Sequence, residues 1–509
     1  MISDTKMLAP AGFQVLQSSL ADFPKTARQY LNNSDRRFGH LTARPISSGF
    51  LAIEALLLDL TCGGGVILTA TLPLGEREYP SISLAIPAAH WAERAVGDMF
   101  GVRAVGHPHW NSLIMHDDAW PLDIAPLMPD PPAEPGKRRQ YKFLKVVGEG
   151  IHEIPVGPIH AGIIEPGHFR FSCVGEIITN LEIRLGYQHR GIEKRLTEIP
   201  WLHARYVAES ASSDTAAGNA LAHAIAIEQL LVIEAPPRAV ALRTIALELE
   251  RLANHVGDLG AMAGDIGYSV GASLFPPMRG MALALAQTLT GSRRQRWFIL
   301  PGGVARDLND TSRASLAKGL AELKKRIVDN VPLILQHPSV LDRMEGTGKL
   351  SPGLARDFGV VGPAGRASGV RYDSRTCFMQ GIYPKHAPAP AVLESGDVLA
   401  RAQVKKLEIA TSIAVIEMLL DELPNTPIQI ALPHQLPPSR IGIGIVEAWR
   451  GELIHWISTN EEGLIARYSI KDPSFNNWTG LAVAVRGNLV ADFPLCNKSF
   501  NLSYSGSDL

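Results

Sequence analysis

The stretch PPRAVALRTIALELERLANHVGD (residues 236–258) decides the fold of this chain. From Val240 onward, apolar residues recur at steps of three and four, which is the spacing of one buried face of an α-helix. The paired prolines at 236–237 suit the first turn, because a proline lacks the N–H that this turn leaves unbonded. The pattern predicts a long helix that buries one face in a large core.

Three charged residues of this helix, Glu248, Arg251 and Asp258, fall elsewhere on its circumference. Gly260 or Gly264 could end it, because glycine is common just past a helix C-terminus.

Outward from this helix, the same periodicity predicts more helices, with glycine turns between them. The expected helices are 280–290, 315–330 and 398–420, and the expected turns are 302–303 and 362–365. Residues 481–490 have the pattern of two strands around a glycine turn.

Before residue 120, strand-like runs at 65–72 and 79–84 precede a helical stretch at 88–100. Residues 121–142 are rich in proline and then basic, which is typical of an extended linker. We therefore expect an α+β protein with a small N-terminal α/β domain (1–120), a proline-rich linker (121–142) and a large, mainly helical domain with a peripheral β-sheet (143–509).

The composition limits the function. The 509 residues are 46% hydrophobic and 19% charged, which is typical of globular proteins. A formal net charge of −1 argues against a nucleic-acid partner. No apolar run reaches the roughly 18 residues of a membrane span, and no secretory signal is evident. We expect a cytoplasmic protein that meets a membrane only through partners.

The cysteines predict no metal site. Cys62, Cys173, Cys377 and Cys496 are scattered, whereas soft metals and iron–sulfur clusters need several converging thiolates. No dinucleotide-binding glycine motif occurs either. We therefore expect the chain to bind no electron-carrying cofactor of its own.

Histidines and glutamates are concentrated in Gly-Pro-Ile-His (157–160), Glu-Pro-Gly-His-Phe-Arg (165–170) and Gly-Tyr-Gln-His-Arg-Gly-Ile-Glu-Lys (186–194). Histidine can carry protons near neutral pH, and a desolvated glutamate can relay them. The alternative is a cluster of solvated or interface salt bridges.

Together with the 237–267 region, these motifs resemble the large subunit of membrane-associated nickel–iron hydrogenases of the formate hydrogenlyase type. They also resemble its relative in respiratory complex I, the 49-kDa-type subunit. The string Glu-Arg-Ala-Val-Gly-Asp-Met-Phe-Gly (93–101) is similar to the signature of the complex I 30-kDa-type subunit.

In the hydrogenases that the chain resembles, two Cys-x-x-Cys pairs hold nickel and iron. The same registers here contain Ser212 and Thr215, and Ser503 and Gly506. A neutral hydroxyl cannot replace a thiolate for these metals, so we expect no metal at this site. A simpler explanation, that residues 212–214 form a helix N-cap, leads to the same conclusion.

The resemblance also assigns candidate catalytic residues. His160 matches a histidine that contacts the quinone headgroup in complex I, and Asp265 matches the aspartate paired with it. If the two are neighbours, the carboxylate should raise the pKa of the imidazole. Ser213 stands where complex I has a quinone-contacting tyrosine, which weakens the case for a quinone. We expect His160, Asp265 and the former ligand positions to line one pocket. The remaining candidates belong to a proton relay or a subunit interface and are Glu165, His168, His189, Arg190 and Glu193.

The resemblance implies a core subunit of a membrane-associated complex I-like or formate hydrogenlyase-like oxidoreductase. Its partners would be a small iron–sulfur subunit, which holds the clusters, and membrane-embedded subunits that resemble proton pumps. The chain would lie on the inner face of the cell membrane, with a quinone as a candidate acceptor. One alternative is a structural or assembly subunit with a non-catalytic pocket. The other, which the missing cysteines weigh against, is a true hydrogenase.

Overall fold

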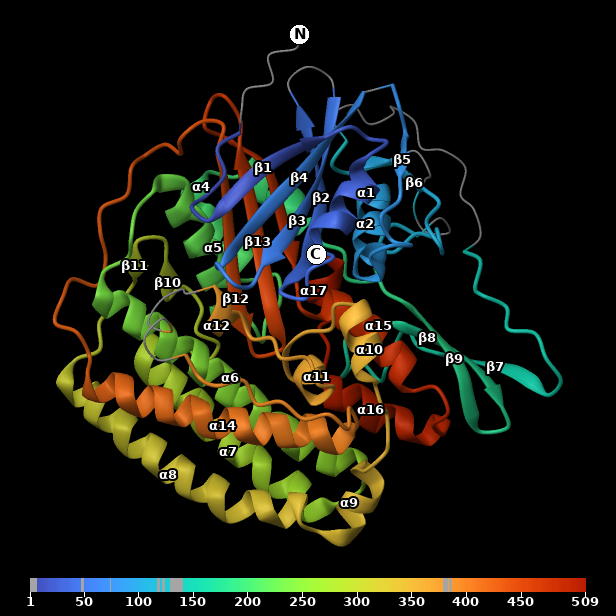
Figure 1. Cartoon of the computed structure of the whole chain (residues 1–509). Coiled ribbons are helices and arrows are strands. Elements are labelled where there is room, and N and C mark those ends of the chain that lie inside the picture. Colours follow the sequence, from blue (N-terminus) through green and yellow to red (C-terminus); the bar gives the residue numbers. More distant parts are fainter. Residues whose placement is uncertain are drawn as a thin grey trace.

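The computed structural model describes residues 7–46, 50–73, 75–116, 120, 124–128, 141–378, 383 and 387–509. Most of the predicted linker therefore lies outside the described residues. Figure 1 shows an N-terminal sheet at the top, a second sheet in the middle and a bundle of long helices below. The predicted α+β class is confirmed.

The N-terminal part is a four-stranded sheet with helices, in the order β1-β4-β3-β2. Its elements are β1 (Phe13–Ser18), α1 (Phe23–Tyr30), β2 (Arg36–Ile46), β3 (Phe50–Asp59), β4 (Gly64–Pro73), β5 (Glu78–Pro80), the 3₁₀ turn η1 (Pro87–Ala89), α2 (His90–Phe100) and β6 (Arg103–Val105). The strand expected at 65–72 is β4, and the expected helix is η1 plus α2. The strand expected at 79–84 ends at Pro80.

The Glu93–Gly101 signature shapes the loops around α2. Glu93 accepts hydrogen bonds from the hydroxyls of Ser81 and Ser83 and from the Ile82 amide. Arg94 donates to two backbone carbonyls at 111–112. Asp98 accepts from three successive amides at 113–115, 2.7–3.1 Å away. The polar residues of this signature therefore hold the neighbouring loops in place.

Four long helices pack together in the bundle of Figure 1: α6 (Pro237–Asp265), α7 (Ser269–Thr290), α8 (Asp310–Leu335) and α14 (Val398–Asp421). The opening stretch forms α6 as predicted, with proline in the first turn, and the helix runs one residue past Gly264. The other three helices include the segments expected from periodicity and extend beyond them.

The expectation of a single buried face on α6 was incomplete. Glu248 and Arg251 are 0% exposed and Asp258 is 3% exposed. Other elements cover the helix on nearly every side, and its charges are accommodated because each is paired. Periodicity identified the apolar face but not the elements that cover the polar one.

The sheet in the middle is buried along almost its whole length and consists of β12 (Ile441–Ala448), β13 (Gly451–Thr459) and β14 (Ile465–Lys471). A tight hairpin at Trp449–Arg450 joins β12 to β13. Helix α5 (Ala216–Leu231) lies directly on β12, because Gly442 and Gly444 have no side chains. A Cβ there would come within 2.1 and 1.9 Å of carbonyl oxygens of α5. This sheet is central, not peripheral.

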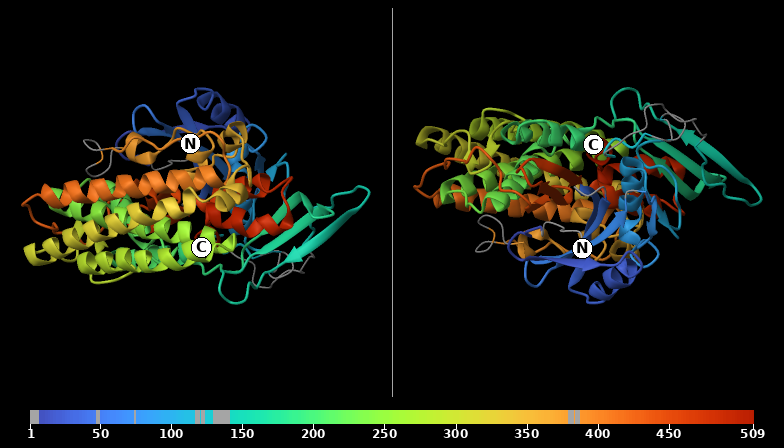
Figure 2. Two further views of the ribbon diagram at one scale, coloured as in Figure 1. Left: turned by 90° about the horizontal axis from the view of Figure 1, so that it is seen from below. Right: turned by 90° about the horizontal axis from the view of Figure 1, so that it is seen from above.

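The peripheral sheet is β7 (Ile151–Val156), β8 (His168–Val174) and β9 (Ile177–Arg184), which projects from one end of the molecule in Figure 2. Helices α3 (Ile192–Glu198) and α4 (Trp201–Ala208) lead from it to α5.

The strand pair expected at 481–490 is wrong. Residues 481–484 end α15 (Ser474–Ala484), and the 3₁₀ turn η2 (Val490–Asp492) follows. A short apolar run does not distinguish a strand from a buried helix. Here the buried residues Leu481, Ala484 and Val485 follow helical spacing. Helices α16 (Phe493–Phe500) and α17 (Ser505–Asp508) complete the described chain.

The remaining elements are short. They are β10 (Ile299–Leu300), β11 (Gly303–Val304), α9 (Pro338–Met344), α10 (Pro352–Asp357), α11 (Gly362–Ala367) and α12 (Ser374–Cys377). The turn expected at 302–303 connects β10 and β11, whereas residues 362–365 begin α11. None of the helices in the described residues has both the length and the apolarity needed to cross a bilayer.

Candidate functional site

The two segments that resemble metal-ligand pairs meet in space. The Ser212 hydroxyl lies 3.0 Å from the Ser503 hydroxyl, although 291 residues separate them in the chain. Both residues are 2% exposed. Because the Ser212 proton is donated to Asp214 at 3.0 Å, Ser503 is the donor of the bond between the two serines. The two segments are thus joined through their hydroxyl groups.

An ion pair lies beside these hydroxyls, in which the Arg450 side chain is 4% exposed and the Asp214 side chain 28% exposed. Arg450 donates two hydrogen bonds of 2.7 Å to the Asp214 carboxylate and a third of 3.1 Å to the Thr215 hydroxyl. Burial alone would raise the pKa of Asp214, but Arg450 outweighs it and holds that pKa well below its usual range. Asp214 is therefore ionised and accepts the hydroxyl protons of both Ser212 and Thr215.

The fourth ligand position has no room for a side chain. A Cβ on Gly506 would lie 2.5 Å from Asp472 Oδ2 and 2.8 Å from Ser503 Oγ. Asp472 is 2% exposed, and burial raises its pKa. A carboxyl group thus fills the space into which a ligand at 506 would extend.

These donors do not fit a nickel–iron centre. Three positions offer neutral hydroxyls already engaged in hydrogen bonds, and the fourth is glycine, whereas such metals select soft anionic sulfur. Within the described residues, no three His, Cys, Asp or Glu side chains are grouped so as to hold a metal ion.

The alternative of a helix N-cap at 212–214 does not match the structure. Thr215 occupies the cap of α5, and its side chain accepts no hydrogen bond from the first turn. Glu250 of α6 instead accepts hydrogen bonds from the amides of Ala217 and Gly218, at 2.8 and 3.0 Å. Burial raises the pKa of Glu250 to about 8. A carboxyl that titrates near neutral pH therefore lies beside the former ligand positions.

His160 and Asp265 do not form the expected pair. His160 Nε2 bonds instead to the carbonyl of Gly167 at 2.8 Å. Burial raises the pKa of Asp265, and the charge that opposes this rise is Lys498. The structure shows no hydrogen bond or ion pair between these two described residues, or from either to Ser212 or Ser503.

Three of the relay or interface candidates support the C-terminal segment. Glu165 accepts from the amides of residues 504–505 at 3.2 and 3.3 Å. His189 bonds to the Asp508 carbonyl at 2.9 Å. Arg190 donates to the carbonyls of residues 210 and 211 and of Ser505, and so connects the two former ligand segments.

The other two candidates hold neighbouring strands. Glu193 bonds to Arg467 at 2.7 Å and to the Ile470 amide at 2.8 Å, which fixes α3 on β14. His168 Nδ1 lies 3.3 Å from the Gly157 carbonyl, and burial lowers its pKa. Sequence reasoning missed Asp214, Glu250, Arg450 and Asp472 as members of the site. Glu250 stood in the quoted stretch 236–258, but nothing in the sequence distinguished Asp472.

Comparisons with known proteins identify the family. The chain matches the model of the respiratory-chain NADH dehydrogenase 30 Kd subunit over residues 24–136 and that of the 49 Kd subunit over 265–443. It is 33% identical to formate hydrogenlyase subunit 5 of Escherichia coli (strain K12), over 85% of this chain and 77% of the relative. It is 32% identical to hydrogenase-4 component G of the same organism, over 91% and 82%.

A solved structure, that of the membrane-bound sulfane sulfur reductase, an archaeal respiratory membrane complex, aligns with a TM-score of 0.67 at 25% identity. The alignment covers 72% of this chain and 100% of that chain. The chain therefore belongs to the family that joins the 30-kDa and 49-kDa subunits of complex I with the large subunits of formate hydrogenlyase and related hydrogenases.

Proposed function

We propose that this chain is the core subunit of a membrane-associated, complex I-like or formate hydrogenlyase-like oxidoreductase, and that its former metal site serves as a proton-coupled relay. Its relatives support the first half, since they are named as subunits of formate hydrogenlyase and hydrogenase-4. The second half rests on one observation, the hydrogen-bonded series from Ser503 through Ser212 to Asp214.

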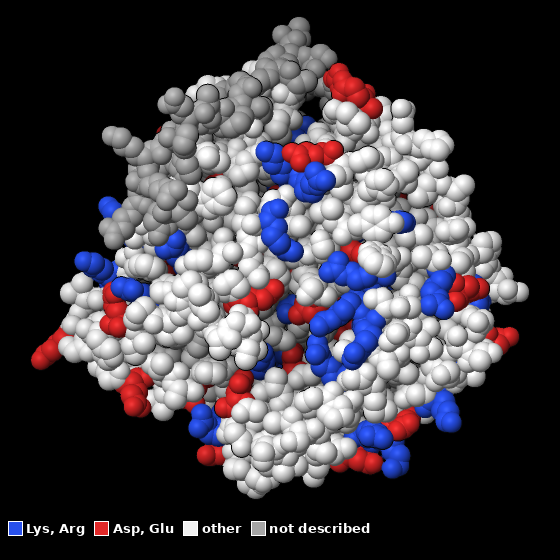
Figure 3. All heavy atoms as spheres, turned by 180° about the vertical axis from the view of Figure 1, so that it is seen from behind, with Lys and Arg blue, Asp and Glu red and all other residues white. Residues whose placement is uncertain are grey.

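The proposed partners are a small iron–sulfur subunit and membrane-embedded subunits, which would hold the chain at the inner face of the cell membrane. In this proposal the electrons come from a partner, since a cluster needs several converging thiolates and the four cysteines of this chain are scattered along the sequence. Lys and Arg side chains gather near the middle of the face in Figure 3, which makes this face a candidate for docking an acidic subunit surface.

Purification of the complex through a tag on this chain tests the composition. We expect an iron–sulfur subunit and membrane-embedded subunits to co-purify, no stoichiometric nickel by elemental analysis and no hydrogen uptake. About one nickel per chain, or redox turnover by the isolated chain, would contradict the proposal.

Replacing Ser212 with alanine tests the relay. Ser212→Ala removes the hydroxyl between Ser503 and Asp214, and we expect turnover of the assembled complex to fall by about 10²- to 10⁴-fold. Ser210→Ala is the matched control, since the Ser210 hydroxyl bonds only to the Val207 carbonyl, outside the series.

The second candidate function is a structural or assembly subunit with a non-catalytic pocket. The observation that favours it is the backbone bond of His160, which leaves this residue without an acidic partner. Normal assembly and unchanged turnover in both Ser212→Ala and His160→Gln complexes would establish the structural role.

A further inference from the structure

Six buried side chains form a closed ring of alternating charge beneath the former ligand site. Each ion pair around the ring spans 2.6–3.6 Å. In order, the members are Glu248, Arg251, Glu408, Arg366, Asp373 and Arg375. None is more than 4% exposed. The three negative charges of the carboxylates equal the three positive charges of the guanidiniums, because arginine stays protonated in proteins.

Two further titratable groups join this ring. Glu447 accepts from Arg366 at 2.7 Å and from the amide and hydroxyl of Ser374 at 3.0 Å each. His255 Nε2 bonds to Glu408 at 2.9 Å, and its buried Nδ1 has no partner. With Glu447 ionised and His255 neutral, the cluster would carry one uncompensated negative charge in a dry interior, which is costly.

The surrounding groups do not supply that missing charge. Tyr383 and Ser412 only donate hydrogen bonds to Glu248. Three cations of neighbouring elements are engaged by carboxylates of their own, in the pairs Lys405–Asp258, Lys471–Glu452 and Arg450–Asp214. Arg37 shares Glu452 with Lys471, at 3.9 Å, but it lies over the Tyr372 ring with its side chain 14% exposed, so water screens its charge. Glu250, next to Arg251 in α6, is a further acid. One bound proton restores neutrality.

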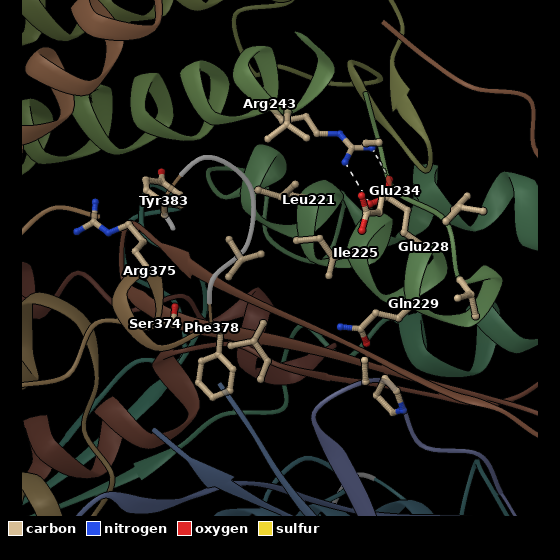
Figure 4. Close-up of a pocket in the computed structure, with 18 of the residues that line it drawn as sticks. Leu221, Ile225, Glu228, Gln229, Glu234, Arg243, Ser374, Arg375, Phe378 and Tyr383 are labelled. Carbon is tan, nitrogen blue, oxygen red and sulfur yellow. Dashed lines mark hydrogen bonds and ion pairs between the residues drawn. The ribbon is translucent and has the colours of Figure 1, made fainter. Parts of the chain in front are cut away.

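The two proton-accepting groups lie toward different regions. Glu447 and Ser374 are among the residues that line a cavity of about 600 Å³, shown in Figure 4, whose walls also include Leu221, Ile225 and Phe378. His255 packs instead against Trp449, ring edge to face at 6.2 Å. The Trp449 indole donates to the backbone carbonyl of Asp214 and to the hydroxyl of Thr215 at the former ligand site.

We propose that this cluster holds one exchangeable proton, on Glu447 or on His255, and thereby connects the cavity with the former ligand site. In the transfer, the O–H bond of the Glu447 carboxyl breaks and an N–H bond forms at His255 Nδ1. The net charge of the cluster does not change. This transfer extends the proposed relay, but the bound proton can be tested on the chain alone.

The electrostatics agree with a resting proton on Glu447. Burial raises the pKa of Glu447, and burial lowers the pKa of His255. For Glu248 and Glu408 the neighbouring guanidiniums outweigh burial and lower the pKa.

A matched pair of variants tests the bound proton. Glu447 and Glu408 both accept from Arg366 at 2.7 Å and are both 2% exposed. In the full chain at neutral pH, we expect Glu447→Gln to leave the thermal midpoint close to that of the wild type. It should also remove one infrared carbonyl component of a protonated carboxyl group. Glu408→Gln should lower the midpoint strongly and retain that component. Equal destabilisation by the two variants, or an unchanged carbonyl spectrum in Glu447→Gln, would overturn the proposal.

The transfer is tested in the assembled complex. We expect Glu447→Gln and His255→Gln each to slow turnover at least tenfold and to reduce the solvent isotope effect. If Glu447→Gln lacks the carbonyl component but turns over normally, the proton is bound but takes no part in turnover, which would refute the transfer. Neither result depends on the outcome of Ser212→Ala, which tests the hydroxyl series separately.

Discussion

At the scale of single residues, the former metal site is closely packed around Gly506 and contains no space for a further side chain there. Gly506 and Asp472 are complementary, because the carboxyl group occupies the volume that a side chain at 506 would need. A site emptied by the loss of its ligands alone would leave a cavity, which is costly in a protein interior. Around residue 506 the site is therefore packed, with the Asp472 carboxyl in contact range of any added side chain.

Gly506→Ala should therefore destabilise the protein by about 1–3 kcal/mol, since the added methyl group overlaps the Asp472 carboxyl. Gly353→Ala in α10 is the control, because a Cβ there meets nothing within 4 Å. Both free energies of unfolding can be measured by denaturant titration. In an Asp472→Ala background the cost of Gly506→Ala should shrink, and an unchanged cost would exclude the overlap as its cause.

At the scale of elements, α5 carries Thr215 into the site but contains no cap of its own. Glu250 connects α6 to the first turn of α5, so the two helices are joined at the site. The helix N-terminus favours a negative charge there, whereas burial opposes it, and burial dominates the pKa of about 8.

Glu250→Ala should cost about 1–3 kcal/mol for each of the two amides left unsatisfied, and Glu250→Gln should cost less because it retains one acceptor. The raised pKa is checked by measuring how the difference in unfolding free energy between the wild type and Glu250→Gln changes with pH. The folded state holds the proton more tightly than the unfolded state, so the contribution of Glu250 is lost as pH rises from about 4.5 to about 8. Over this pH interval the stability of Glu250→Gln should therefore rise relative to that of the wild type. If the stability difference between the two proteins does not vary with pH, the pKa of Glu250 is not raised.

At the scale of the whole molecule, the N-terminal sheet and the C-terminal sheet form one continuous core. His40 of β2 bonds to Ser469 of β14 at 2.9 Å, and Arg467 reaches the Ala43 carbonyl. His40 is buried between elements of both parts, and desolvation lowers its pKa to about 3.

Acid should therefore weaken the contact between the two parts. His40 is neutral in the folded state, so its contribution to stability is complete above pH 6.5 and is lost as pH falls toward 3. In His40→Gln the loss of unfolding free energy over this interval should be shallower than in the wild type, with the exposed His434→Gln as control. If the unfolding free energies of all three proteins fall in parallel with pH, His40 is not responsible for the acid sensitivity.

The sequence by itself determined the α+β class, the four long helices, the family and the chemistry that the site lacks. Apolar periodicity and the types of donor atom are properties of the local chain, so they can be read without coordinates. Only the tertiary structure decided that Asp472 fills the position of Gly506, that Glu250 caps α5 and that His160 bonds to Gly167 and not to Asp265. These contacts join residues up to hundreds of positions apart. The energies of buried charges depend on which partners the fold brings within a few ångströms, and no spacing in the sequence records that.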